Sequence, residues 1–141
     1  MLLLASTFEE LGWHGYGFDS LTAKLSLLKA TIVFGLLWSI WHLPLMFVSG
    51  SYQYELLRAN PLYILNFFVS IVPLGIIISW IYLRNNRSVI MAILFHLIVN
   101  FSQEMFMITN NTKCIETIIL ILLAAVIVSG DKKLFLSNSN Q

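Results

Sequence analysis

The chain has 141 residues, of which 58% are hydrophobic and only 11% are charged. Soluble domains are roughly 45–50% apolar and about 25% charged, so a small soluble globule of this composition could not cover its surface with polar groups. Eight Lys and Arg residues are balanced by seven Asp and Glu residues, which excludes the basic surface of a nucleic-acid-binding protein. The single cysteine, Cys114, excludes an intrachain disulfide. The composition therefore predicts an integral membrane protein that contacts lipids and has no nucleic-acid partner.

Taken in chain order, the apolar segments predict a series of membrane helices. Residues 1–8 are apolar but too short to cross a bilayer, so we expect the chain to begin inside a helix. Residues 17–24 show near-helical apolar spacing, which predicts a short amphipathic helix along the headgroups. Four longer apolar segments predict spans at about residues 30–49, 61–83, 88–108 and 114–130, because a spanning helix needs ~20 residues.

These segments predict an all-α fold, a polytopic transmembrane helix bundle with about four spans and a partial N-terminal helix. Residues 1–130 form its single domain, and residues 131–141 form a polar, frayed tail. If the spans alternate in direction, one side of the membrane receives most of the basic residues, namely Lys24, Lys29, Arg84, Arg87, Lys132 and Lys133. The other side receives only Arg58 and Lys113. The positive-inside rule therefore predicts a multi-pass protein of the cell membrane with a cytoplasmic C-terminal tail.

Two adjacent glutamates and a histidine stand out near the N-terminus. Ionisable side chains cost ~2.5–3.5 kcal/mol each at the centre of a membrane helix, so they favour a functional interpretation. Glu9 and Glu10 point about 100° apart on a helix, and only Glu10 has His14 four residues on, within contact distance. The pair is either a solvated, interfacial pair just past a helix end or a desolvated site in which one carboxylate is a general base on water.

The other two histidines lie inside predicted spans. His42 has Trp38 one turn earlier on the same helical face and Pro44 just after it, and a proline there frees a backbone carbonyl. His42 is either a buried imidazole bonded to a neighbouring helix or a site residue. His96 and Asn100 share a helical face. They either join helices by polar contacts or donate hydrogen bonds to a developing oxyanion.

Three segments together resemble the motifs of a known family. They are Glu-Glu-Leu-Gly-Trp-His-Gly-Tyr at 9–16, Trp-Ser-Ile-Trp-His-Leu-Pro at 38–44 and Phe-His-Leu-Ile-Val-Asn at 95–100. In order and spacing they are similar to the CPBP family, the CAAX protease and bacteriocin-processing (Abi) group of intramembrane endopeptidases. The resemblance covers about the first 100 residues and suggests a short or N-terminally truncated member.

The resemblance implies a role for each motif residue. Glu9 would activate the attacking water with help from His42, His96 and Asn100 would stabilise the oxyanion, and Glu10 would support the first motif. Glu9, His42 and His96 are also chemically suited to bind zinc. A metal-free glutamate mechanism uses the same side chains, so the need for a cofactor stays open.

Two residues depart from the family pattern. His14 stands where the motif has arginine, and this exchange replaces a permanently charged, bidentate donor by a group that titrates near neutrality. Trp38 replaces the motif phenylalanine and keeps an aromatic side chain. We treat both as supporting residues of the predicted site.

The leading hypothesis is an intramembrane endopeptidase that uses a glutamate-activated water to cleave a peptide or a membrane-anchored protein. One alternative is a non-catalytic membrane immunity or peptide-binding protein that keeps the motif residues. A further alternative is a metal-binding or proton-relay transporter, since buried histidines serve such roles in membrane proteins.

Overall fold

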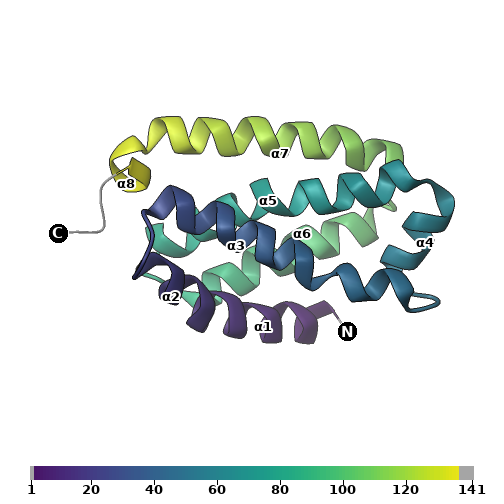
Figure 1. The fold of residues 1–141 in the computed structure, drawn as a ribbon, viewed down its shortest axis with the longest axis horizontal. Helices are drawn as coiled ribbons and strands as arrows, with labels where there is room; N and C mark the ends of the chain where they lie inside the picture. The colour runs from purple at the N-terminus through teal and green to yellow at the C-terminus, as the bar shows by residue number, and fades with distance from the viewer. Residues whose placement is uncertain (1, 137–141) are drawn as a thin grey trace.

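The computed structural model describes residues 2–136, and every regular element in that range is a helix. In chain order these are α1 (Leu2–Gly12), the π-helical segment η1 (Trp13–Gly17), α2 (Phe18–Thr22), α3 (Leu27–Trp41), the 3₁₀-helix η2 (Leu43–Phe47), α4 (Tyr52–Ala59), α5 (Pro61–Arg84), α6 (Val89–Met105), α7 (Asn110–Gly130) and α8 (Lys132–Leu136). The long helices lie side by side along the length of the molecule (Figure 1). The predicted all-α helix bundle is confirmed.

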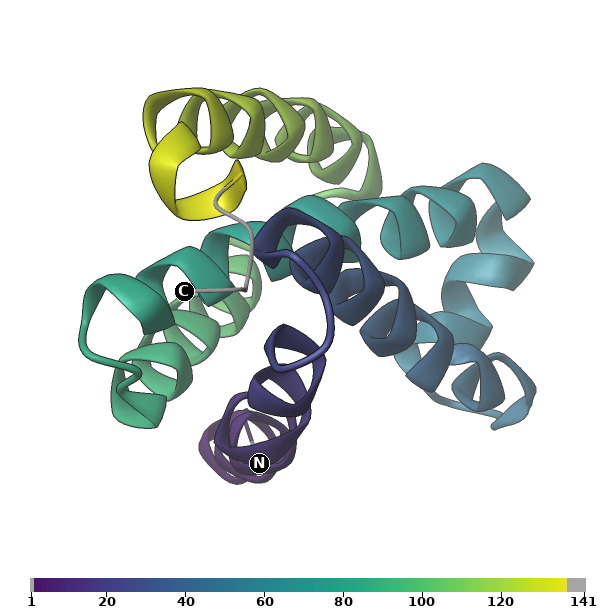
Figure 2. The same cartoon turned by 60° about the vertical axis from the view of Figure 1, so that its left-hand side comes forward.

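Three segments are long and apolar enough to cross a membrane, namely Leu27–Phe47, Pro61–Arg84 and Asn110–Gly130. Helix α6 is apolar but shorter, at 17 residues. These helices lie on the four apolar segments of the sequence, as expected for a multi-pass membrane protein. Helix α7 packs against α5 at the edge of the bundle (Figure 2), and most of its isoleucine and leucine side chains are exposed, as suits a surface in contact with lipid.

The N-terminal segment is one continuous helix from Leu2 to Thr22, with a wide π-turn in its middle. In this turn the Phe18 amide bonds to the Trp13 carbonyl, five residues back. Four fully buried side chains recur every four residues along one face of this helix: Ser6, Glu10, His14 and Phe18. On a regular α-helix each such step overshoots a turn by about 40°. The π-turn takes more residues per turn and so reduces this drift.

This continuous helix bears on two expectations. The segment at 17–24 does not form a helix of its own, because α2 continues the N-terminal helix, and its Phe18 side chain is completely buried in the core of the bundle; its position along the headgroups stays a prediction. Glu9 and Glu10 lie within α1 rather than past a helix end. The interpretation of these two carboxylates as a solvated pair is therefore wrong for Glu10, which is fully buried.

Helices α3 and α5 approach closely at two glycines. A Cβ atom on Gly35 would lie only 2.9 Å from the Val72 Cα atom, and one on Gly75 would lie 3.1 Å from the Gly35 Cα atom. Only glycine permits this backbone approach, which is a common device in membrane helix packing. The contact fixes α3 against α5, and hence the position of Trp38 in the last turn of α3 and of His42 directly after that helix.

The predicted frayed tail is wrong for residues 132–136, which form α8, where the Phe135 side chain is fully buried. The residues 137–141 lie outside the described residues. Asp131, just before α8, accepts hydrogen bonds from Trp80 Nε1 at 3.0 Å and from the guanidinium of Arg84. The Arg84 guanidinium holds the pKa of the Asp131 carboxyl below its usual range. These contacts join the end of α7 to the end of α5.

Candidate active site

A cavity of about 390 Å³ lies between the long helices and α4. Five of the residues singled out in the sequence line it, from three different helices: Glu9, Trp38, His42, His96 and Asn100. Two others, Glu10 and His14, are fully buried and do not line it. The motif residues therefore divide into a group that faces the cavity and a pair that lies behind it.

Glu9 is the carboxylate that faces the cavity. Its Oε2 atom accepts a hydrogen bond of 2.9 Å from Trp38 Nε1, which orients the side chain toward α3. Its Oε1 atom makes no hydrogen bond to any of the residues 2–136. Glu9 thus presents one unengaged oxygen at the cavity wall, and the adjacent Glu10 points elsewhere, as the helical spacing predicted.

Glu10 lies at the centre of a buried hydrogen-bond chain. Its Oε2 atom is 2.5 Å from His14 Nδ1, and its Oε1 atom is 2.8 Å from His96 Nδ1. This series of hydrogen bonds continues from His14 Nε2 to Ser79 Oγ at 3.1 Å. It therefore joins the N-terminal helix to α5 and α6, which are far away in sequence. Sequence reasoning missed Ser79, although a serine within the apolar α5 was a signal that could have been read.

His14, at the position of the motif arginine, is enclosed by aromatic rings. The centroids of Phe34, Tyr82 and Phe18 lie 4.8, 5.1 and 5.3 Å from that of the imidazole. Both ring nitrogens of His14 are engaged, one by Glu10 and the other by Ser79. The imidazole is therefore fitted to this position, with its polar atoms satisfied in a site that excludes solvent.

The end of α3 orients the His42 imidazole. Because Pro44 has no amide N–H, the α-helix gives way to the 3₁₀-helix η2 after Trp41. The His42 amide then bonds to the Ser39 carbonyl at 3.1 Å, so the Trp38 carbonyl accepts from the side chain of His42, at 2.8 Å from Nδ1. Since a carbonyl only accepts, Nδ1 carries the proton. In the neutral imidazole the Nε2 atom is then a free acceptor.

The two histidines in the cavity wall share a feature of metal ligands, since each engages Nδ1 with an oxygen and leaves Nε2 for another partner. Nevertheless, no three His, Cys, Asp or Glu side chains within residues 2–136 come close enough to hold one metal ion. The predicted zinc ligands Glu9, His42 and His96 line one cavity without forming a coordination cluster. Their arrangement in this structure does not fit a zinc site.

The cavity also extends to a polar region at the start of α7. There Lys113 Nζ donates a hydrogen bond of 2.9 Å to the hydroxyl of Tyr52 and lies 4.5 Å from the centroid of its ring. Glu116 accepts a hydrogen bond of 3.2 Å from Gln103. All four side chains line the cavity. The cavity wall thus carries a carboxylate and two imidazoles near Glu9, and both a basic and an acidic side chain near the start of α7.

A second hollow, of about 500 Å³, lies on the outer side of Glu9. Its lining is almost entirely apolar and consists of Phe8, Glu9, Gly12, Trp13, Tyr16, Gly17 and Trp41. Glu9 lines both hollows. Glu9 is thus the residue that the apolar hollow shares with the polar cavity.

Comparison with known proteins places this arrangement in a family. A family described as "Type II CAAX prenyl endopeptidase Rce1-like" matches residues 1–102, a range that contains all the predicted site residues. A curated relative, "CAAX prenyl protease 2" of Methanococcus maripaludis, is 57% identical over 135 residues. The alignment covers 96% of this chain and 50% of the relative, so the chain spans about half of the length of that protein. On these two matches the chain belongs to the Rce1-like family of type II CAAX prenyl endopeptidases.

Proposed function

We propose that the chain is an intramembrane endopeptidase that hydrolyses a peptide bond with a water activated by Glu9. The observation that carries the proposal is the unengaged oxygen of Glu9, presented at a cavity that His42, His96 and Asn100 also line. A nucleophilic water, its base and the donors for an oxyanion need to surround one reacting carbonyl. These four side chains supply the three roles from three helices.

In the proposed reaction Glu9 is the general base. Its Oε1 atom takes a proton from water as the water oxygen attacks the carbonyl carbon of the scissile bond. Trp38 holds the other carboxylate oxygen in place. His42 Nε2 accepts a hydrogen bond from the second O–H of the water and so orients it. When the C–N bond breaks, the proton held by Glu9 passes to the leaving nitrogen, which gives a carboxylic acid and an amine. The acid then loses its remaining proton to the amine, so the released products are a carboxylate and an ammonium group.

His96 and Asn100 are the proposed donors to the oxyanion. Asn100 donates from Nδ2. His96 Nδ1 is engaged with Glu10, so the ring donates from Nε2 in its doubly protonated form, for which the Glu10 carboxylate is the counter-ion. Preorganised donors of this kind stabilise the charge that develops in the transition state, and removing one such donor lowers kcat by about 10²–10³-fold.

The proposed substrate is a peptide or membrane-anchored protein with a prenylated cysteine near its C-terminus. The curated relative is named a CAAX prenyl protease, and a CAAX sequence carries the isoprenoid on its cysteine. The apolar hollow, or groove, that shares Glu9 with the cavity supports such a substrate, because a hydrocarbon chain beside the scissile bond gains by leaving water. We propose that the groove takes the isoprenoid and the cavity takes the residues after the cysteine.

The proposal is tested with the purified chain in lipid vesicles and a synthetic peptide that ends in a farnesylated CAAX sequence. Mass spectrometry is expected to detect release of the C-terminal tripeptide, and much less from the same peptide without the farnesyl group. Binding of the farnesylated peptide without any release would contradict the proposal and favour the non-catalytic peptide-binding alternative.

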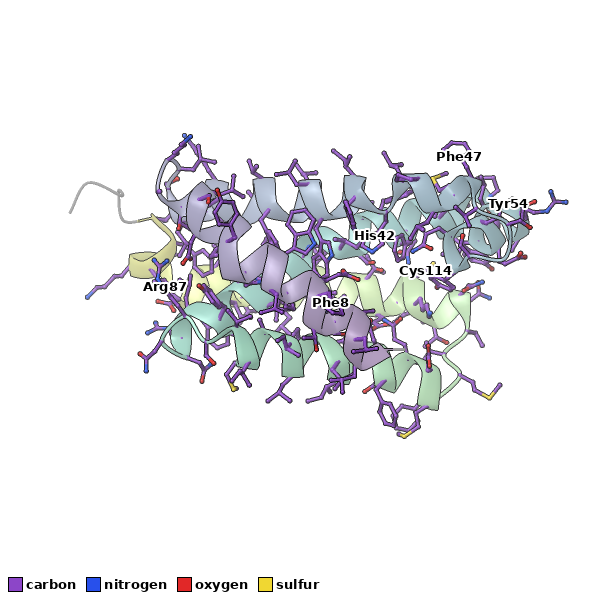
Figure 3. The ribbon with its side chains drawn as sticks, turned by 90° about the horizontal axis from the view of Figure 1, so that it is seen from below. Phe8, His42, Phe47, Tyr54, Arg87 and Cys114 are labelled. Atoms are coloured by element: carbon purple, nitrogen blue, oxygen red, sulfur yellow. The ribbon has the colours of Figure 1, made fainter. Side chains whose placement is uncertain are left out.

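We also propose that the C-terminal tail is cytoplasmic, as the distribution of basic residues favours. Arg87 lies at the tail end of the bundle, and Cys114 lies toward the opposite end, on the same side as Tyr54 (Figure 3). The cavity extends to Lys113, next to Cys114. In this orientation the polar end of the cavity is directed away from the cytoplasm.

Cys114, the only cysteine, reports this orientation. A membrane-impermeant maleimide added to intact cells is expected to label it, because its thiol is partly exposed near the non-cytoplasmic end of α7. The Cys114→Ser variant is the control for background labelling. Labelling only after the cells are broken would reverse the orientation, and would direct the polar end of the cavity to the cytoplasm.

A further inference from the structure

Ser6 carries the one side-chain polar atom within residues 2–136 that is buried without any hydrogen-bond partner. The side chain is completely buried and does not line the cavity. A hydroxyl can donate one hydrogen bond and accept two, and an unsatisfied buried polar group is costly to a fold. Such a group needs an explanation, and near an enzyme site one explanation is a partner that engages it in another state of the protein.

The register of two helices identifies that partner. Helix α1 runs antiparallel to α6, because Gly15 faces Val89 at the start of α6, whereas Glu10 bonds to His96 about two turns further along α6. Ser6 lies four residues before Glu10, and Asn100 lies four residues after His96. One turn along each antiparallel helix from a direct 2.8 Å contact therefore brings Ser6 level with Asn100.

We propose that Ser6 is a positioning residue for Asn100, an inference that rests on the proposed function. When substrate occupies the cavity, the Ser6 hydroxyl donates to Asn100 Oδ1. That bond turns the Nδ2 group of the carboxamide toward the oxyanion. In the resting structure the side chain of Asn100 makes no hydrogen bond to any described residue. The carboxamide is thus free to adopt this orientation. The Ser6 hydroxyl forms its hydrogen bond only in the step in which Asn100 donates to the oxyanion.

The test compares Ser6→Ala with the wild-type chain in the tripeptide-release assay and in thermal unfolding. Loss of the hydroxyl is expected to lower kcat by about tenfold, with little change in KM, because one hydrogen bond that is made in the transition state is lost. The unfolding temperature is expected not to fall, because the hydroxyl has no partner in the resting protein. A merely structural serine would show the reverse pattern.

A double-mutant cycle separates action through Asn100 from any other effect. In the Asn100→Ala background, or in Asn100→Gln if that retains more activity, Ser6→Ala is expected to cause no further loss. Thr7→Ala is the matched control, because the Thr7 hydroxyl bonds to Leu3 of its own helix at 2.7 Å, and it is expected to keep wild-type kcat. Equal kcat for Ser6→Ala and wild type, or an equal loss in both backgrounds, would overturn the inference. A wild-type chain that releases no tripeptide would instead overturn the proposed function, and this inference with it.

Discussion

Glu9→Gln is expected to lower peptide-bond hydrolysis by about two to four orders of magnitude, the usual contribution of a general base. The carboxamide is nearly the same size as the carboxylate, and its oxygen can still accept the hydrogen bond from Trp38 Nε1. It cannot take a proton from water. Because Glu9 is half-buried and outside the buried hydrogen-bond chain, we expect the unfolding temperature in detergent to stay close to that of the wild type.

The measurement is tripeptide release from the farnesylated peptide, together with thermal unfolding of the same sample. Glu55→Gln is a suitable control, because Glu55 is an exposed glutamate of α4 that lies outside the cavity lining. A Glu9→Gln variant that retains wild-type turnover would show that another group activates the water. A variant that loses turnover only because it unfolds would be recognised from its lowered unfolding temperature.

Glu10→Ala is expected to reduce both turnover and stability, in contrast to the substitution at the neighbouring residue. Removing this carboxylate leaves His14 Nδ1 and His96 Nδ1 without their partner, and each buried polar group that is left unsatisfied costs roughly 1–3 kcal/mol. The same change removes the proposed counter-ion of His96. We therefore expect a lowered unfolding temperature and a loss of turnover that exceeds the fraction of unfolded protein.

Glu10→Gln separates these two effects. The carboxamide fills the same space and can bond to both imidazoles after a change of tautomer, so most of the stability is expected to return. Because the carboxamide carries no charge, turnover is expected to stay below that of the wild type. If Glu10→Ala unfolds at the wild-type temperature, the buried hydrogen bonds of Glu10 do not stabilise the packing of α1 against α6.

The sequence was sufficient for features that depend on short stretches of chain. The apolar segments indicated a bundle of membrane helices, because burial in lipid is a matter of local composition and length. The contact between Glu10 and His14 followed from their spacing, because residues four apart lie on one face of a helix. Glu9 was expected to face away from Glu10 for the same reason, and it does.

Other features depended on how distant segments pack. The contact of His14 with Ser79 joins residues 65 apart in sequence, and that of Glu10 with His96 joins residues 86 apart. No local pattern encodes such pairs. The π-turn at Trp13–Gly17 was missed because the sequence signals for helix starts and stops do not distinguish it from a regular turn, yet it helps to keep His14 and Phe18 on the buried face.

The sequence by itself therefore determined that this is a membrane protein with ionisable residues in apolar helices, because hydropathy and helical periodicity act over a few turns. Only the tertiary structure decided the distribution of the two glutamates. Packing of α1 against α6 encloses Glu10 between His14 and His96, whereas Glu9 lines the cavity and accepts a hydrogen bond from Trp38 of α3. The reason is the sequence separation over which each feature is encoded. Hydropathy and periodicity are local, whereas the partners of a buried polar group come from whichever helices surround it, and those helices are set by the fold as a whole.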